Sequence, residues 1–175
     1  MCIRDRHGRV GVDVFFAISG FLITLLLLRE RERTGTLSLK GFYTRRVLRI
    51  LPAYLTFVLV LFGLTRLGLA VVRPQDWVGV LTYTVNYVRN QTWAIGHVWS
   101  LSIEEQFYLV WPLLLLLMGP RRARGAVLGY LIAAPLARGF IWVFGQGWLT
   151  LASEWRLERV DSIAVGCLLA LWAMD

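Results

Sequence analysis

The chain lacks most features of a disulfide-rich or secreted domain. It has two cysteines in 175 residues, Cys2 and Cys167, so neither a disulfide framework nor a cysteine-based metal site is expected. No internal repeat, heptad run or low-complexity segment occurs, and the residues from Met1 to Arg6 lack the apolar core of a signal peptide. We therefore expect no metal cofactor and no disulfide-stabilised fold.

The sequence instead contains several long apolar segments. Hydrophobic residues make up 57% of it and the mean hydropathy is +0.60, above the range of ordinary soluble domains. A large soluble core is the alternative, but it would need more polar covering surface than the chain has. Segments near ~20 residues, enough to cross ~30 Å of hydrocarbon, recur along the chain. The sequence predicts an all-α, polytopic transmembrane helical bundle with four full spans and one cut short: Val10–Leu28, Ile50–Val72, Val98–Met118, Ala126–Phe144 and Val160–Met174.

The net charge of +8 is unevenly distributed. Ten basic residues lie in two alternate connections, 29–49 and 119–125, and four lie in the other two, 73–97 and 145–159. This is the positive-inside pattern, so we expect membrane lipid and not nucleic acid as the basic partner. The first span then runs from outside to inside. Trp77–Val88 is apolar but short, and we expect it to be interfacial or re-entrant. If it crossed the membrane instead, the orientation of every later span would invert.

Polar residues gather where the third span begins, from His97 to Tyr108. On a helix, Ser100, Glu104 and Tyr108 share one face, because they are spaced by four residues. An ionisable group at a membrane edge is a functional-site hypothesis. Glu104 is expected to act in a site or to pair with an arginine that shapes one, and a purely structural role is the alternative. His97 is a candidate general base, or an interfacial histidine with one wet face.

The neighbouring carboxylate, Glu105, points to another face and has a simpler interpretation. Ser102 and Glu105 match the Ser-x-x-Glu pattern of a capping box, in which Ser102 would be the N-cap of the helix.

A second cluster, Arg45, Arg46 and Arg49, begins the second span. Arg46 and Arg49 are three residues apart, so two guanidinium groups can converge on one anion, such as a phosphate-rich cytosolic ligand. The alternative is ordinary topological anchoring beside anionic lipid.

Three further ionisable residues occur at the predicted outer ends of the first and last spans: Asp13, Arg159 and Asp161. With Glu104, they predict a polar pocket at the outer face. Arg66 and Arg138 lie within spans, where they must snorkel or pair, and the sequence does not assign their partners.

Four ordered stretches carry a family resemblance: Gly11–Thr24, Arg45–Pro52, Trp99–Tyr108 and Arg159–Gly166. Together they resemble the integral-membrane acyltransferase family 3, which includes bacterial O-antigen and other glycan O-acetyltransferases. The resemblance implies a bundle of about ten spans in the bacterial cytoplasmic membrane. It implies transfer of an acyl group, usually acetyl from acetyl-CoA, to a hydroxyl of an envelope glycan, for instance in lipopolysaccharide, or of a lipid-linked saccharide.

The resemblance also implies roles for particular residues. Arg46 and Arg49 correspond to a cytoplasmic Arg-x-x-Arg element facing the CoA phosphates. Glu104 and His97 fall at motif positions near the outer face, as do the expected pocket residues, which are Asp13, Ser100, Tyr108, Arg159 and Asp161.

One departure from the family pattern affects the prediction. Family members carry a first helix with an arginine and, eleven residues later, a histidine central to transfer, which nothing before Val10 supplies. We therefore expect residues 1–9 to be an atypical, non-native head. Residues 10–175 would be a partial acyltransferase domain, about half of the whole, and inactive alone.

Two other classes of function stay open from sequence. A transporter or flippase would move its substrate unmodified through broken helices. A non-catalytic membrane scaffold would keep the helices and lack the chemistry.

Overall fold

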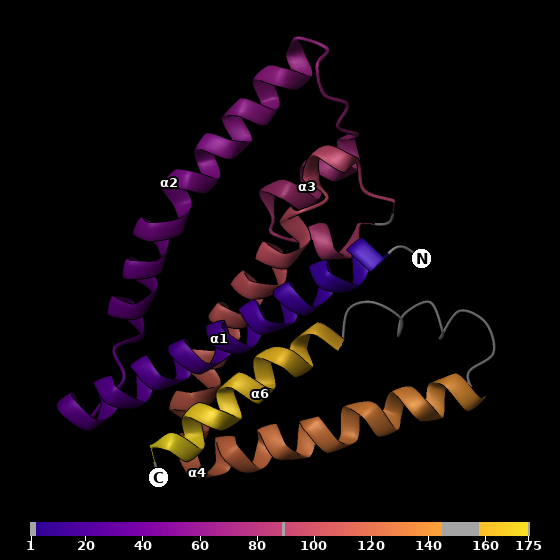
Figure 1. Cartoon of the computed structure of the whole chain (residues 1–175). Helices are drawn as coiled ribbons and strands as arrows, with labels where there is room; N and C mark the ends of the chain where they lie inside the picture. The colour runs from indigo at the N-terminus through magenta and orange to yellow at the C-terminus, as the bar shows by residue number, and fades with distance from the viewer. Residues whose placement is uncertain (1–2, 89, 145–157, 175) are drawn as a thin grey trace. The chain divides into compact units, whose positions relative to one another are not determined.

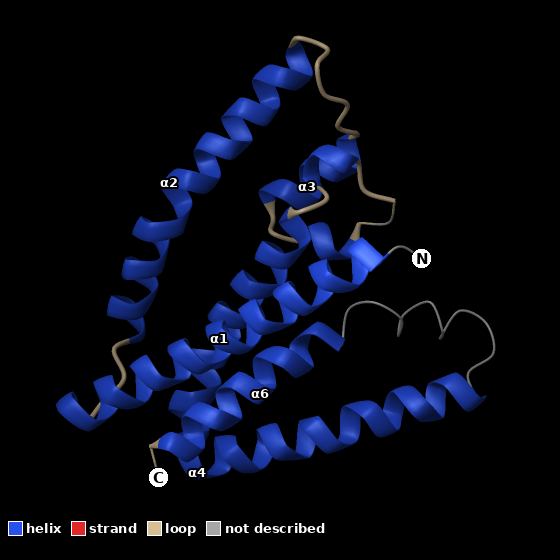
Figure 2. Ribbon diagram, viewed as in Figure 1, coloured by secondary structure: helices blue, strands red, loops and turns tan. Residues whose placement is uncertain are grey.

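The computed structural model describes residues 3–88, 90–144 and 158–174, and within these ranges every regular element is helical (Figures 1 and 2). The expected all-α fold class is confirmed. The elements are α1 (Ile3–Thr34), α2 (Leu39–Arg66), α3 (Pro74–Leu81), η1 (Val85–Tyr87), η2 (Trp93–Ile95), α4 (Val98–Phe144) and α6 (Glu158–Ala173). They form two compact units. The first unit comprises residues 1–37 and 111–175, and the second comprises 38–110.

In the first unit, α1 and α6 lie side by side because small residues let their backbones approach closely (Figure 1). A Cβ atom added to Gly20 would overlap the carbonyl oxygen of Ile163, and one added to Gly166 would overlap that of Ala17. In addition, the Cys167 thiol contacts the Gly20 carbonyl oxygen at 3.7 Å. Close packing at small residues is a common way to join helices in a membrane, where apolar burial between helices contributes little.

The helix α4 contains two of the expected spans. Its backbone leaves the helical region at Gly119, where φ is 72° and ψ is 165°, and Pro120 follows. A positive φ suits glycine, and proline is well placed at the first position of a new helix. In Figure 1 the helix direction changes there. The arginines after the kink, expected in a loop, are instead in the first turns of the second helical segment.

The helix α2 in the second unit begins before the predicted span Ile50–Val72, and the predicted C-terminal end of that span was wrong. It begins at Leu39, because the Ser38 hydroxyl caps its first turn by accepting from the Gly41 amide at 3.2 Å. It ends at Arg66, because Gly68 has a φ of 72° and breaks the helical path. The arginine cluster is therefore helical and lies in the first turns of a 28-residue helix.

The polar-rich end of the second unit is built from short elements. Helix α3 has eight residues, about 12 Å at 1.5 Å per residue, which is too short to cross a membrane. Trp77–Val88 is therefore not one continuous helix, and its interfacial or re-entrant placement stays a prediction. A small core holds these elements together, and the Tyr54 hydroxyl joins α2 to α3 by donating to the Val80 carbonyl oxygen at 2.6 Å.

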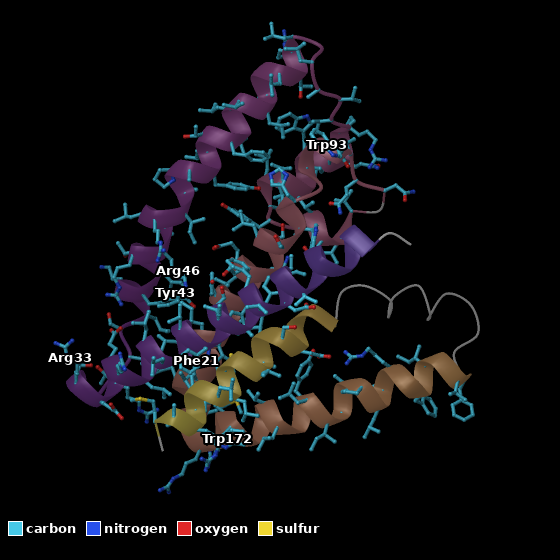
Figure 3. The ribbon with its side chains drawn as sticks, viewed as in Figure 1. Phe21, Arg33, Tyr43, Arg46, Trp93 and Trp172 are labelled. Atoms are coloured by element: carbon cyan, nitrogen blue, oxygen red, sulfur yellow. The ribbon has the colours of Figure 1, made fainter. Side chains whose placement is uncertain are left out.

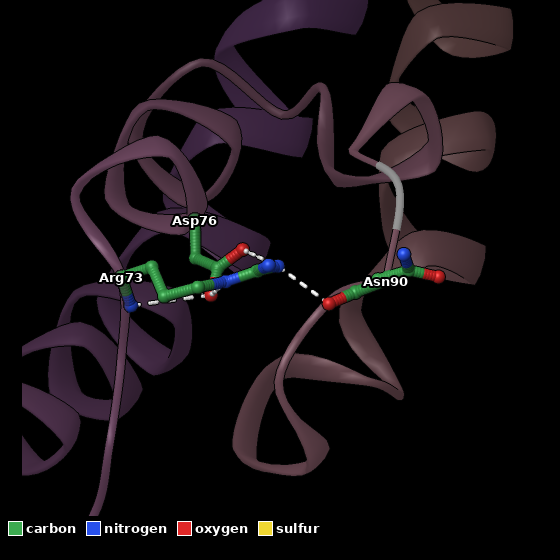
Figure 4. A network of polar contacts seen from close by, with 3 residues as sticks. All are labelled: Arg73, Asp76 and Asn90. Carbon is green, nitrogen blue, oxygen red and sulfur yellow. Dashed lines mark hydrogen bonds and ion pairs between the residues drawn. The ribbon is translucent and has the colours of Figure 1, made fainter.

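An ion pair fixes the start of α3. The side chain of Asp76 is fully buried, and it accepts from the Arg73 backbone amide at 3.2 Å and from the Arg73 guanidinium at 2.9 and 3.1 Å. The same guanidinium donates to the Asn90 carbonyl oxygen at 2.5 Å (Figure 4). Arginine beside it lowers the pKa of the Asp76 carboxyl below its ordinary value. This pair joins α3 to the loop that leads into α4.

Three helical segments are long and apolar enough to cross a membrane: Val10–Thr34, Leu39–Arg66 and Val98–Ile141. Only 11% of the apolar window of α2 is buried within the protein. Its exposed Leu48 and Leu59 would be a liability in water and are suited to lipid. The last expected span, Val160–Met174, corresponds to α6, a shorter apolar helix. These helices are those of a multi-pass membrane protein.

Candidate functional site

The centre of the candidate site in the second unit is a contact between Arg46 and Tyr108. The guanidinium carbon of Arg46 lies 3.6 Å from the centroid of the Tyr108 ring and 5.8 Å from that of Phe42. A cation over an aromatic face is attracted by the ring quadrupole, most strongly where water is excluded. Arg46 projects from the same stretch of α2 as Tyr43, whose hydroxyl donates to the Leu109 carbonyl oxygen at 2.7 Å (Figure 3).

Glu104 is the next member of this cluster. Its side chain is 6% exposed, and it accepts a hydrogen bond from the hydroxyl of Tyr108, which is itself buried. The prediction that these two residues share one face of the helix is confirmed. A continuous chain of contacts thus runs from the cation of Arg46, through the aromatic ring of Tyr108, to the buried carboxylate of Glu104.

The capping-box interpretation of Glu105 is wrong. The helix begins at Val98, four residues before Ser102, and the Ser102 hydroxyl donates back to the Val98 carbonyl oxygen at 3.1 Å. Ser102 is therefore inside the helix, with its side chain completely buried. Glu105 is half-buried, and its Oε1 has no hydrogen-bond partner among the described residues. The charges that act on it most are those of Arg46 and Glu104.

A polar pair that the sequence analysis missed links α4 to the loop after α3. Gln106 donates from Nε2 to the Tyr83 carbonyl oxygen at 2.8 Å and to the Asn86 side chain at 3.1 Å, and Asn86 donates back at 3.4 Å. Tyr83 has a φ of 53°, and its ring stacks on Tyr54 with centroids 4.3 Å apart. Burial and the nearby Glu105 raise the pKa of Tyr83 to about 12. The sequence contained one indication of this contact, since Gln106 is a polar residue within an apolar helix and so needs a hydrogen-bond partner.

Of the two candidate catalytic residues, Glu104 lies within α4, whereas His97 precedes it. His97 is exposed just before the helix and packs edge-on against Phe57, with ring centroids 5.3 Å apart. Its carbonyl oxygen accepts from the Ser100 hydroxyl at 3.1 Å. Seven residues of helix correspond to about 10 Å along the axis, so His97 and Glu104 do not form a compact pair at that spacing. The catalytic role of each stays a prediction.

The three arginines expected to bind phosphate have different environments. Arg46 is half-buried against Tyr108, whereas Arg45 and Arg49 are exposed. The Arg45 guanidinium turns back toward the helix start, where Nη1 lies 3.2 Å from the position of a Cβ on Gly41. Convergence of Arg46 and Arg49 on one anion stays a prediction.

A second polar cluster lies in the first unit, where α6 begins. The Ser162 hydroxyl donates to the Asp13 carboxylate at 3.3 Å, joining α6 to α1. The neighbouring Asp161 forms an ion pair with Arg138 and accepts a hydrogen bond from Tyr130, both on α4. The side chain of Arg159 lies outside the described residues.

Among the residues that the structure describes, no three histidine, cysteine or acidic side chains are grouped as a metal ion would require. Both units contain buried or half-buried carboxylates that lie beside a cation or a hydroxyl, among apolar helices.

These features define a multi-pass membrane protein with ionisable groups held inside its helical layers. Residues 3–173 match the sequence model of one protein family, described as an acyltransferase domain (Acyl_transf_3). Since this match covers nearly the whole chain, the chain belongs to the Acyl_transf_3 family. No solved structure matches it.

Two relatives illustrate the similarity. O-acetyltransferase OatA of Staphylococcus aureus (strain NCTC 8325 / PS 47) is 33% identical over 182 residues, which covers 94% of this chain and 30% of the relative. The protein SACOL0978 of Staphylococcus aureus (strain COL) is 40% identical over 121 residues, covering 62% of this chain and 20% of the relative. The chain therefore spans less than a third of the length of these relatives.

Proposed function

We propose that the chain is part of a bacterial membrane O-acyltransferase. In this proposal the enzyme takes an acyl group, acetyl in the simplest case, from acyl-CoA at the cytoplasmic face. It delivers that group to a hydroxyl of an envelope glycan or a lipid-linked saccharide. Membership of the Acyl_transf_3 family supports the reaction class, and the printed name of OatA states O-acetyl transfer for that relative.

The observation that carries the proposal is the chain of contacts from Arg46 through Tyr108 to Glu104. A cation held at one end of this chain suits an anionic donor, and a guanidinium is well matched to phosphate oxygens. A buried carboxylate at the other end can accept a hydrogen bond from a hydroxyl and so position it for reaction. Both kinds of group suit transfer from a phosphate-bearing donor to an alcohol.

The groups of the first unit have a separate part in the proposal. Hydrogen-bond acceptors at one end of α1 and α6 come from Asp13 and Asp161, and Arg138 supplies donors there. Carboxylates that accept from hydroxyls, as Asp13 does from Ser162, are typical of saccharide recognition. We assign them to the acceptor and not to the donor.

The test is made in the longest form of the protein that contains this segment, reconstituted in lipid. We expect Arg46→Ala combined with Arg49→Ala to raise the KM for acyl-CoA by at least about tenfold, because each lost charge-assisted hydrogen bond is worth about 1.5–3 kcal/mol. Membrane insertion and the KM for the acceptor should stay the same. Arg33→Ala with Lys40→Ala removes the same charge from exposed positions and is the matched control.

Donor kinetics that are equal in the variant and the control would refute the assignment of Arg46 and Arg49 to the donor site. Transport of an intact saccharide without consumption of acyl-CoA would refute the proposed function itself. The two failures are thus distinguishable in one preparation.

A further inference from the structure

A cavity of about 350 Å³ lies in the first unit where three helical segments meet. Its walls come from the end of α1, the start of the second segment of α4 and the end of α6. The charged side chains that line it are Arg31, Arg121, Arg124 and Glu32, so the cavity has an excess of positive charge. Leu28 and Leu171 give it an apolar wall.

The kink of α4 shapes this cavity. Gly119 has no side chain, and Nη1 of Arg31 lies 3.7 Å from the position that a Cβ there would take. The guanidinium therefore packs over the kink itself. The segment that follows begins at Pro120, which also lines the cavity, and a helix N-terminus adds partial positive charge.

Topological anchoring explains arginines at a membrane face in general, but it does not explain their arrangement here. Arg29, Arg33 and Arg122 are exposed, as anchors are, and Arg33 points away from the helices in Figure 3. Arg31 and Arg124, in contrast, are half-buried and line one cavity. The lining residues include three arginines and a single carboxylate, that of Glu32, so an anion in the cavity would interact favourably with them.

We propose that this cavity binds a phosphate group carried on a larger organic ligand. Guanidinium groups match phosphate oxygens in geometry and charge, and the apolar wall suits a ligand that is not a bare ion. Two sources share this chemistry: a soluble phosphate ester, such as a donor with a diphosphate, or the headgroup of an anionic phospholipid. Arg46 and Arg49 are not among the lining residues, and the proposal does not depend on the proposed reaction.

The experiment uses the full chain in nanodiscs of phosphatidylcholine. In one arm, inorganic pyrophosphate is titrated in and its binding followed by calorimetry. In the other arm, the discs also contain phosphatidylglycerol, and lipid retained by the protein is counted by native mass spectrometry. Arg31→Gln with Arg124→Gln removes two cavity arginines, and Arg29→Gln with Arg122→Gln removes the same charge from exposed positions.

We expect one of the probes to bind saturably, and the cavity variant to weaken that binding at least about tenfold, since each charge-assisted hydrogen bond to an anion is worth roughly a factor of ten or more. The exposed-position variant should weaken it by less than about threefold, through screened long-range charge alone. Pyrophosphate binding identifies a soluble ligand, and retained phosphatidylglycerol identifies a headgroup.

The proposal is overturned if neither probe binds saturably to the parent chain. It is also overturned if the two double variants lose binding equally, because the cavity would then act only as general surface charge. Circular dichroism and size-exclusion profiles, compared for all three proteins, establish that the variants keep the parent fold. An Arg31→Lys variant that keeps much of the affinity would further support the proposal.

Discussion

The guanidinium of Arg138 is paired with the carboxylate of Asp161, with Nη1 and Oδ1 separated by 3.4 Å and Nη2 bonded to Oδ2. Arg138 comes from the second segment of α4 and Asp161 from α6, and their side chains are only 19% and 24% exposed. An arginine in an apolar helix is costly unless it finds a partner, and this pair provides one. The contact therefore joins α4 to α6.

The ion pair predicts a strong coupling between the two positions. Arg138→Leu alone removes the cation beside the half-buried Asp161 carboxylate, and Asp161→Leu alone removes the carboxylate beside the Arg138 guanidinium, so we expect each to lower the midpoint of thermal unfolding in detergent. The double variant should lose less stability than the sum of the losses in the two single variants. The difference, which is the coupling free energy, should be about 0.5–3 kcal/mol. Additive single effects would show that the two side chains do not interact energetically.

The ion pair of Asp76 and Arg73 predicts a pH dependence. Arg73 lowers the pKa of Asp76 in the folded state below the value near ~4 of an unfolded aspartate. The unfolded chain then binds the proton more tightly, so the pair stabilises the fold above about pH 4, and this stabilisation is lost as pH falls through the lowered folded pKa. Asp76→Asn should therefore be less stable than the parent chain at pH 7.

The measurement for Asp76 is hydrogen exchange of the α3 amides at pH 7 and in acid. The difference between Asp76→Asn and the parent chain should shrink as pH falls below about 4, because the parent loses the ionised carboxylate there. Glu32→Gln, at an exposed position, should show no such pH-dependent difference. If Asp76→Asn lowers the protection of the α3 amides by the same amount at every pH, Asp76 acts by its shape and not by its charge.

The helical fold could be predicted from sequence because hydropathy and length decide it almost alone. The ends of α2 could not. The apolar run continues through Leu67–Val72, and only the left-handed conformation at Gly68 ends the helix before it. The Ser38 cap, in turn, extends the helix back through a basic segment that hydropathy assigns to a loop.

In the candidate site, too, some contacts could be predicted from the sequence and others could not. Spacing by four residues correctly paired Glu104 with Tyr108, because that geometry is fixed within one helix. The partners of Arg138 and Gln106 come from segments about 20 residues away or more, and nothing in a single sequence fixes such pairs. The Ser102–Glu105 pattern misled, because a cap depends on where the helix starts, and this helix starts at Val98.

The glycine at the α1–α6 contact predicts a large effect from a small change. Even Gly166→Ala places a Cβ against the Ala17 carbonyl oxygen, which is backbone and cannot rotate away. We expect a loss of about 1–3 kcal/mol, typical of overpacking, seen as a lower unfolding temperature. Gly129→Ala is the matched control, since nothing lies within 4 Å of its added Cβ and alanine favours a helix. Equal behaviour of the two variants would contradict close packing at Gly166.

The last prediction separates the two contacts of Tyr108. Tyr108→Phe keeps the ring beneath Arg46 but removes the hydroxyl that donates to the buried Glu104. If Glu104 acts on the acceptor hydroxyl, we expect kcat to fall by about tenfold or more in the longest form of the protein, since a hydrogen bond to a charged group is worth about 1.5–3 kcal/mol. The KM for acyl-CoA should change little, because the cation–π contact remains.

Tyr108→Leu removes both contacts and should in addition raise the KM for acyl-CoA, because Arg46 loses the ring that holds it. The exposed Tyr87 provides the control, and Tyr87→Phe should leave both constants unchanged. If Tyr108→Phe and Tyr108→Leu have the same kcat and the same KM, the ring does not position Arg46. If Tyr108→Phe is as active as the parent protein, the hydroxyl does not prepare Glu104, and a structural role is left for that carboxylate.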